Sequence, residues 1–242
     1  MEFVEDETKR PGIESILAKL IYEYHTYLPV GTNLLAHLRY PQLASVLNSS
    51  FDQRPRGGST RTRLGNFIEI LACELAKKQG YDIPVLRLQY NPNPDQSMRG
   101  DDLLGFRSID DESGKKTVLV GEGKFRSSFA ASVVGEAYDD LKAKARSGAI
   151  SMEFTAAILS RQGDKAKAAK IMQLRKQVVL KDKEVTQKYL LFLSTVGRPQ
   201  DPFECLEDFA GELLPNLVAV NVVFKTGLQD WLDQVYNQEY GH

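Results

Sequence analysis

The sequence predicts an α/β protein with a mixed central sheet flanked by helices, and two observations support this prediction. Apolar residues recur with a period near 3.6 before Pro84, as in an amphipathic helix, and with a period of 2 directly after it, as in a strand. Later, two short apolar runs, Tyr189–Val196 and Asn216–Phe224, are typical of strands and lie between segments of helical periodicity. Strands interleaved with helices in this way favour a sheet that helices cover.

The composition excludes several protein classes. The chain has 242 residues and 27.1 kDa, with 42% hydrophobic and 26% charged residues. It contains no run of about 18–20 apolar residues, which a membrane span requires, and its acidic start, MEFVEDETKR, is unlike a signal peptide. Cys73 and Cys205 are too few for a disulfide framework or a Cys-based zinc cluster, and three histidines leave little for a His-rich metal site. We therefore expect a cytoplasmic protein.

The first part of the chain is expected to be helical over 13–47 and to continue as a loop over 49–63. The loop contains a proline, two adjacent glycines and four arginines, so it is the best candidate for a mobile connector. We accordingly divide the chain into an N-terminal helical segment with its basic loop, residues 1–60, and a main domain, residues 61–242. A single domain is the alternative.

A strong amphipathic helix is expected over 64–79, ended by Gly80. One of its faces is apolar, and a second stripe consists of small residues with Glu69 among them. A carboxylate among small side chains can come close to a neighbouring backbone, which is unusual for a glutamate that only faces solvent.

The elements after this helix follow from the same periodicities. Alternation of apolar residues predicts strands over 86–90, 102–107 and 117–125, and the loop IDDESGKK predicts a hairpin between the second and third. Further helices are expected over 127–146, 151–161, 164–180 and 228–236, and further strands over 189–196 and 216–224.

Charge is distributed unevenly although the net charge is only -1. Residues 161–188 carry a net charge of +6, and residues 201–242 carry -7. The basic stretch could bind phosphate, and the acidic stretch could bind a basic partner. Alternatively, both stretches are helix surfaces that simply face solvent, which would give the same numbers of charged residues.

The best candidate for chemistry is formed by Asp102, at the head of the second strand, and by Glu122 and Lys124 on the third. Residues two apart on a strand share a face, so Glu122 and Lys124 are expected side by side, with Asp102 within reach across the hairpin. Two carboxylates with an ammonium suit a hard divalent cation such as Mg²⁺ and a phosphate under attack. Gly121 and Gly123 would leave room for a backbone or phosphate near this site.

Glu-x-Lys alone has little weight, because so short a pattern occurs by chance in a chain with 16 Glu and 17 Lys. Asp140-Leu-Lys142 has the same acid-x-Lys pattern but is expected within a helix, where residues two apart point in different directions, so it does not form a site. An exposed, salt-bridged hairpin end is the alternative interpretation of Glu122 and Lys124. The context favours a site, because an acid heads the preceding strand and a Glu-bearing helix precedes both.

The order of helix with Glu69, strand, strand with Asp102, strand with Glu122-Gly123-Lys124 and helix resembles the PD-(D/E)xK nuclease superfamily, with its restriction-endonuclease-like core. More narrowly, RLGNFIEILACELA, RGDDLLGF and VGEGKFRSS resemble the HamA family, the nuclease subunits of Hachiman-type antiphage defence systems. This resemblance runs from about Arg61 to the C-terminus. The proline that usually precedes the first aspartate is absent, so either Asp101 or Asp102 is the ligand; we choose Asp102 because it heads the strand.

The resemblance implies a Mg²⁺-dependent deoxyribonuclease, with Mn²⁺ as a possible substitute. Asp102, Glu122 and the carbonyl of Gly123 would hold the metal, Lys124 would position the hydrolytic water, and Glu69 would supply an additional or outer carboxylate. The phosphodiester would be hydrolysed in line. The resemblance also implies a HamB-like helicase partner that restrains the nuclease until DNA damage or phage entry. We expect the acidic residues 201–242 to form part of that interface.

Contacts to DNA are the least defined part of the prediction. The candidates are Arg61, Arg63, Arg126 and Ser127, supported by the lysines and arginine of 165–175. Ser127 and Ser128 are expected to cap the helix that follows them, with or without a role toward phosphate. No stacking motif or base-reading pattern stands out, so we expect sequence-independent cleavage.

Other functions have less support. Neither internal histidine lies in a nucleophile context, so Ser/His/Asp and Cys/His catalysis have no support. No Gly-rich phosphate loop is present, so we do not expect this chain to hydrolyse ATP itself. Two alternatives stay open: a catalytically weak DNA-binding or scaffolding subunit of a helicase complex, and a restriction-type endonuclease with sequence preference.

Overall fold

The sheet organises the molecule. The structure is a computed structural model, and it describes residues 2–4, 6–25, 59–90, 101–111, 115–146, 150–197, 201–209 and 213–236. Within these residues the strands form one five-stranded sheet in the order β1-β5-β4-β3-β2. Their bounds are β1 Glu2–Val4, β2 Leu103–Arg107, β3 Lys116–Arg126, β4 Val185–Val196 and β5 Leu217–Phe224.

The sheet is mixed. The hairpin partners β2 and β3 are antiparallel, whereas β3 and β4, β4 and β5, and β1 and β5 are parallel. Parallel neighbours need crossover connections, which here are supplied largely by helices. The helices are α1 Arg10–His25, α4 Thr60–Lys78, α5 Ala131–Arg146, α6 Ile150–Arg161, α7 Lys165–Val179 and α8 Leu228–Tyr236.

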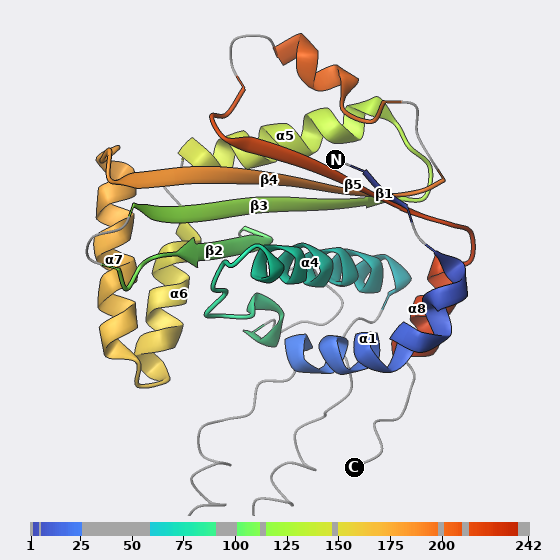
Figure 1. The fold of residues 1–242 in the computed structure, drawn as a ribbon, viewed down its shortest axis with the longest axis horizontal. Helices are drawn as coiled ribbons and strands as arrows, with labels where there is room; N and C mark the ends of the chain where they lie inside the picture. The colour runs from blue at the N-terminus through green and yellow to red at the C-terminus, as the bar shows by residue number, and fades with distance from the viewer. Residues whose placement is uncertain are drawn as a thin grey trace, which may run out of the picture.

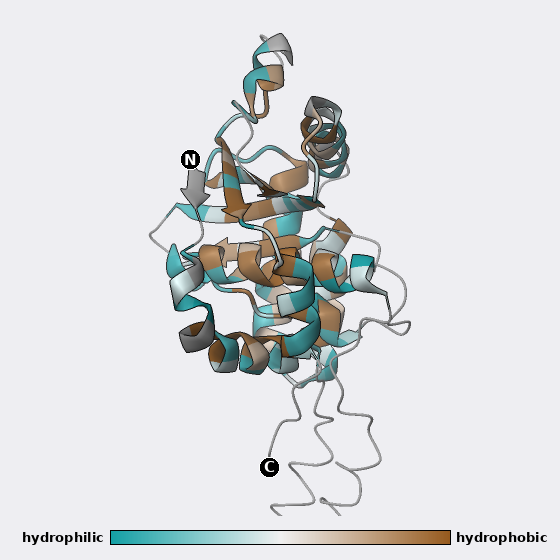
Figure 2. Ribbon diagram, turned by 90° about the vertical axis from the view of Figure 1, so that its right-hand side faces the viewer, coloured by the Kyte–Doolittle hydropathy of each residue, from teal (hydrophilic) through white to brown (hydrophobic). Residues whose placement is uncertain are grey.

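Helices cover both faces of the sheet (Figure 1). One face packs against α1, α4 and α8, through strand residues such as Leu119 and Phe192. The other packs against α5, α6 and α7, through the alternate residues such as Val120 and Leu191. Figure 2 shows hydrophobic residues both on the strands and on the helices around them. The predicted α/β class with a mixed sheet flanked by helices is confirmed.

The N-terminal residues that the structure describes belong to the same core. Glu2 to Val4 pair with Asn221 to Val223 of β5. The helix α1 contributes buried side chains to the cluster formed with α4 and α8, and Trp231 Nε1 of α8 donates to Glu14 Oε1 at 2.9 Å. The rest of the predicted N-terminal helix and most of the basic loop, residues 26–58, lie outside the described residues.

The long helix α4 begins earlier than predicted. Ser59 is its N-cap and accepts from the Thr62 N–H at 3.2 Å, so Thr60 to Arg63 are helical and not part of the loop. At the other end, Gly80 has φ +81°, a left-handed conformation that stops the helix as predicted.

Two local predictions are wrong. The residues Leu86–Tyr90 form a 3₁₀ turn, η2 (Arg87–Tyr90), and not a strand. This turn buries Leu88 beside α1, where the Gln89 side chain donates to the Glu23 carbonyl at 2.8 Å, so tertiary packing overrides the alternating pattern. The helix α5 begins at Ala131, three residues after the exposed Ser128, so Ser127 and Ser128 do not cap it.

The other predicted elements form within a few residues of their expected bounds. None of the helices in the described ranges combines the length and apolarity that crossing a membrane requires.

Candidate functional site

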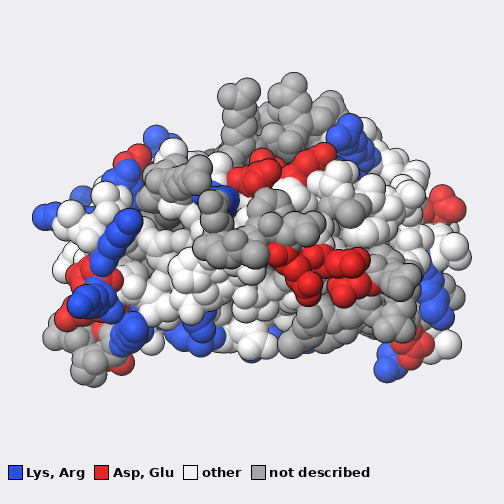
Figure 3. All heavy atoms as spheres, turned by 90° about the horizontal axis from the view of Figure 1, so that it is seen from above, with Lys and Arg blue, Asp and Glu red and all other residues white. Residues whose placement is uncertain are grey.

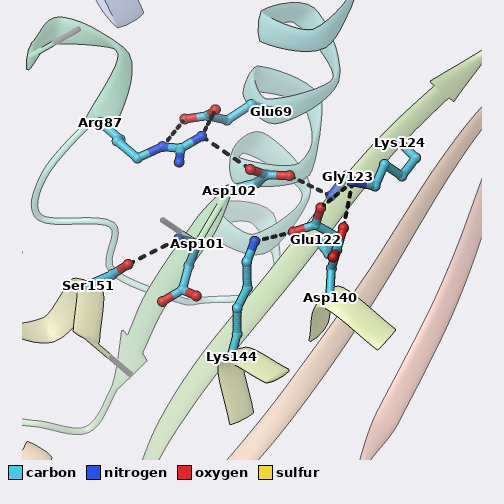
Figure 4. A network of polar contacts seen from close by, with 10 residues as sticks. All are labelled: Glu69, Arg87, Asp101, Asp102, Glu122, Gly123, Lys124, Asp140, Lys144 and Ser151. Atoms are coloured by element: carbon cyan, nitrogen blue, oxygen red, sulfur yellow. Dashed lines mark hydrogen bonds and ion pairs between the residues drawn. The ribbon is translucent and has the colours of Figure 1, made fainter. Parts of the chain in front are cut away.

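The hairpin between β2 and β3 places the first two candidate carboxylates together. Leu103 pairs with Gly121, so the residue before Leu103 lies beside the residue after Gly121. Asp102 and Glu122 therefore meet across the hairpin, as predicted (Figure 4). The Gly123 N–H donates to Asp102 Oδ2 at 3.0 Å, which fixes this carboxylate against the β3 backbone.

A guanidinium joins Asp102 to the helix α4. Arg87 Nη2 lies 2.6 Å from Glu69 Oε2 and 3.1 Å from Asp102 Oδ1, and Arg87 Nε donates to Glu69 Oε1 at 3.3 Å. The side chains of Arg87 and Glu69 are only 12% and 8% exposed. We call Glu69, Arg87 and Asp102 the Arg87 cluster.

The second half of the site lies between β3 and α5. Lys124 Nζ lies 2.8 Å from Glu122 Oε1 and 2.9 Å from Asp140 Oδ2, and Lys144 Nζ pairs with Glu122 Oε2. Glu122 is buried, whereas the Asp140 side chain is 55% exposed. We call Glu122, Lys124, Asp140 and Lys144 the Glu122 cluster.

Gly121 and Gly123 make room for the protein's own side chains. A Cβ on Gly121 would lie 2.9 Å from Leu103 Cβ, and one on Gly123 would lie 3.0 Å from Ile68 Cγ2. These glycines therefore let β2 and α4 approach β3 closely, which brings Glu69 and Asp102 to the site. The predicted space for a phosphate above them is filled by Leu103 and Ile68.

Asp101 is a further buried carboxylate at this site. Its Oδ2 has no hydrogen-bond partner among the described residues, and its N–H donates to Ser151 Oγ at 3.1 Å. A cavity of about 20 Å³ is lined by Asp101, Asp102, Glu69, Arg87 and Ser151, among others. It is far below the roughly 300 Å³ that ligand pockets usually offer, so this cavity is too small for a nucleotide.

Burial and pairing shift the protonation equilibria of the site. Burial raises the pKa of Glu69 to about 7, although the Arg87 charge acts in the opposite direction. Burial, and then the charge of Asp102, raise the pKa of Glu122. Burial alone would lower the pKa of Lys124, but its bonds to Glu122 and Asp140 outweigh burial, so that the pKa lies above its ordinary value. Lys124 is therefore an ammonium at neutral pH.

The donor set suits a hard cation, although its members are paired at present. Asp102, Glu122 and the orphaned Asp101 oxygen are carboxylate oxygens of the kind that Mg²⁺ prefers. In the described part of the chain, however, no three His, Cys, Asp or Glu side chains converge as a ready-made metal site. These oxygens fit a metal ion chemically, but Arg87, Lys124 or Lys144 has to move away from them before a metal ion can bind.

The structure brings Glu69, Asp102, Glu122 and Lys124 together. The predicted DNA contacts are divided between two places, the end of β3 and the start of α4. Arg126 and Ser127 directly follow the site at the end of β3, where Arg126 Nη2 lies 3.6 Å from Glu136 Oε2. Arg61 and Arg63 lie in the first turn of α4. Arg63 pairs with Asp233 at 2.9 Å and stacks over the Tyr236 ring, so it ties α4 to α8.

The basic helix α7 is partly neutralised by the chain itself. Lys167, Lys170 and Arg175 pair with Asp82, Asp110 and Glu153, respectively. Figure 3 looks onto the α5 side and shows acidic side chains near the middle of that face, with Lys and Arg toward its ends. The +6 stretch therefore presents less free charge than the sequence count suggests.

Sequence reasoning missed Arg87 and Lys144, and it treated Asp140 as a decoy. Alternation assigned Arg87 to the outer face of a strand, and no pattern pointed to its role. Lys144 follows Asp140 by four residues on the same helix face, so the pair could have been found from its helical spacing.

Comparisons with known proteins show what the whole chain is similar to. A family model described as HamA matches residues 6–209. The Hachiman protein HamA of Bacillus cereus is 42% identical over 87 residues, a stretch that covers 36% of this chain and 30% of that relative. The alignment thus spans less than a third of the curated relative.

Proposed function

The chain belongs to the HamA family, and from this premise we propose that it is a metal-dependent nuclease that hydrolyses DNA without sequence preference. Its proposed setting is Hachiman antiphage defence, the system that its Bacillus cereus relative is named for, in which it would work with a helicase partner. The observation that carries the proposal is the meeting of Asp102 with Glu122 and Lys124 on adjacent strands, backed by Glu69 from α4. This is the arrangement expected of a PD-(D/E)xK nuclease.

The proposed metal ligands are Asp102, Glu122 and the Gly123 carbonyl. The Gly123 N–H points at Asp102, and since the N–H and C=O of a strand residue leave the same side of the strand, the carbonyl faces the same edge. A bound Mg²⁺ would supply charge that stabilises the attacking and leaving oxygens of the phosphodiester.

The chain's own residues would complete the reaction. Lys124 would orient the attacking water and offset negative charge beside Glu122. Arg126 and Ser127, exposed or half-exposed at the end of β3, would meet the DNA backbone. Arg61 supplies a more distant contact from the start of α4, some 12 Å along the helix from Glu69.

The test is digestion of supercoiled plasmid and linear DNA, with Mg²⁺ or with EDTA. We expect the wild type to convert DNA in Mg²⁺ and Glu122→Gln/Lys124→Met to be slower by about 1,000-fold or more, because it lacks both the ligand and the positioning ammonium. The matched control is Lys19→Met/Glu23→Gln, which removes one ammonium and one carboxylate from an exposed pair of α1. Each protein is assayed alone and with a helicase and ATP.

A second candidate is a catalytically weak DNA-binding or scaffolding subunit. It is favoured by the pairing of Asp102 and Glu122 with cationic side chains, which leaves the carboxylates neutralised. Absence of cleavage under every condition, with DNA binding retained in the double variant, would select this candidate. Discrete digestion products instead of a smear would indicate a nuclease with sequence preference.

A further inference from the structure

Each oxygen of the two candidate ligand carboxylates faces a hydrogen-bond donor. Asp102 Oδ1 accepts from Arg87 and Asp102 Oδ2 from the Gly123 N–H. Glu122 Oε1 pairs with Lys124 and Glu122 Oε2 with Lys144. A divalent cation placed between these carboxylates would therefore lie against another positive charge, so at least one of the donors has to move.

The four donors differ in chemical kind and in flexibility. The Gly123 N–H belongs to a strand that pairs with β4 over its whole length. Arg87 is tied to two carboxylates and is 12% exposed, and Lys124 bridges Glu122 and Asp140. Lys144 extends a flexible four-carbon stem from α5 toward Glu122, and its side chain is 20% exposed.

The charge of Lys144 also reaches several carboxylates of the site. Its ammonium acts electrostatically on Glu69, Asp101 and Glu122, which come from three different elements of the site. In Figure 4 its Nζ lies between Glu122 and the two aspartates. That is the place from which a cation can neutralise all of these carboxylates together.

We propose that the Lys144 ammonium fills this place in the metal-free protein and thereby weakens the binding of a divalent cation. The inference rests on the proposed function and concerns the regulation of the same site. When a divalent cation binds, the Lys144 ammonium leaves Glu122, which its flexible stem allows. Lys144 is thus a built-in competitor for the metal.

The test measures cation binding without DNA. Mn²⁺ is titrated calorimetrically into the full chain after treatment with EDTA, and thermal unfolding of the metal-free proteins is followed in parallel. The variants are Lys144→Met and Lys144→Gln, both neutral, of which the second retains a donor for Glu122, and Lys144→Arg, which retains the charge. Lys142→Met is the matched control on the same helix, and Glu122→Gln reports whether binding occurs at this site.

We expect both neutral variants to bind Mn²⁺ about tenfold more tightly than the wild type, because a competing charge is gone. They should also melt at a lower temperature without metal and regain the difference when Mn²⁺ is added. Lys144→Arg and Lys142→Met should bind as the wild type does.

Two results would overturn the inference. If binding depends on Glu122 but the neutral variants bind equally or more weakly, Lys144 does not compete with the metal, and the proposed function is untouched. If no variant shows Glu122-dependent binding, the metal site itself is wrong, and the proposed function fails together with the inference.

Discussion

The two halves of the site neutralise their carboxylates in different ways. The Arg87 cluster uses a nearly buried guanidinium that bonds two carboxylates from α4 and the head of β2. The Glu122 cluster uses two ammonium groups, and one of its carboxylates, Asp140, is more than half exposed. A planar guanidinium holds two carboxylates rigidly, whereas a lysine on a flexible stem can exchange partners.

This difference indicates a division of labour. The Arg87 cluster joins α4, η2 and the head of β2, so its charges hold the framework in place. The Glu122 cluster pairs its carboxylates with two lysines, and Asp140 is more than half exposed, so its charges can exchange partners more readily. Stability and reactivity should therefore respond differently to substitutions in the two clusters.

The largest effect on stability is expected at Arg87. Arg87→Met leaves Glu69 buried without its partner, so we expect the free energy of unfolding to fall by about 3–5 kcal/mol. Arg87→Met/Glu69→Met should recover most of this loss, because it removes the uncompensated charge. Urea titrations in EDTA measure both, and Arg175→Met, which breaks an exposed pair with Glu153, should cost below about 1 kcal/mol. If Arg87→Met and Arg175→Met lowered the free energy of unfolding equally, the buried Arg87 cluster would be no more important for stability than an exposed ion pair.

The next effect is the pH dependence of stability that Glu69 confers. Its pKa is about 7 in the folded chain against an ordinary value of 4.5. Between these values the folded protein holds a proton that the unfolded chain has released, so stability falls as the pH rises from about 4.5 to 7. Glu69→Gln has no proton to lose there and should flatten the decline by about 1–3 kcal/mol.

Urea titrations of the metal-free protein between pH 5 and 8 would measure this slope. Glu153→Gln, an exposed carboxylate of α6, is the control and should leave the slope unchanged. Identical slopes for the wild type and Glu69→Gln would mean that Glu69 stays ionised throughout, and the Arg87 cluster would then be a permanent ion pair.

The smallest effect is expected at Asp140, in the other cluster. Asp140→Asn removes a partly exposed partner of Lys124, so the free energy of unfolding should change by less than about 1 kcal/mol. Loss of this bond should also lower the pKa of Lys124 toward its ordinary value, since Asp140 helps to raise it. Nuclear magnetic resonance of the lysine side chains would follow that titration. A destabilisation as large as that of Arg87→Met would show that the Glu122 cluster is structural as well.

Sequence reasoning reached the part of the site that depends on local geometry. The hairpin follows from alternation and a turn, and its register alone brings Asp102 to Glu122 and Glu122 to Lys124. These contacts span at most about 20 residues and need no knowledge of the remaining fold. The helices with strong periodicity, such as α4 and α8, were predictable for the same reason.

The rest of the site depends on packing between distant elements. Arg87 reaches Glu69 and Asp102 because η2 turns beneath α1, which an alternating pattern does not reveal. Lys144 reaches Glu122 because α5 packs on β3, and the sequence alone does not set the rotation of that helix. Conversely, Ser127 resembled a cap in sequence, but the helix begins after it, at Ala131.

The pairing of β1 with β5 has a consequence for the synthesis of the chain. The residues of both clusters lie between 69 and 144, whereas β5 begins at Leu217, roughly 70 residues later. At about 5–20 residues per second, the ribosome completes the site several seconds before it makes the strand that β1 joins. Glu2 to Val4 can pair with β5 only after nearly the whole chain has been synthesised. The helix α8 follows β5 in the chain, so it contacts α1 later still. The chemical groups of the site are made early, and the framework that encloses them closes late.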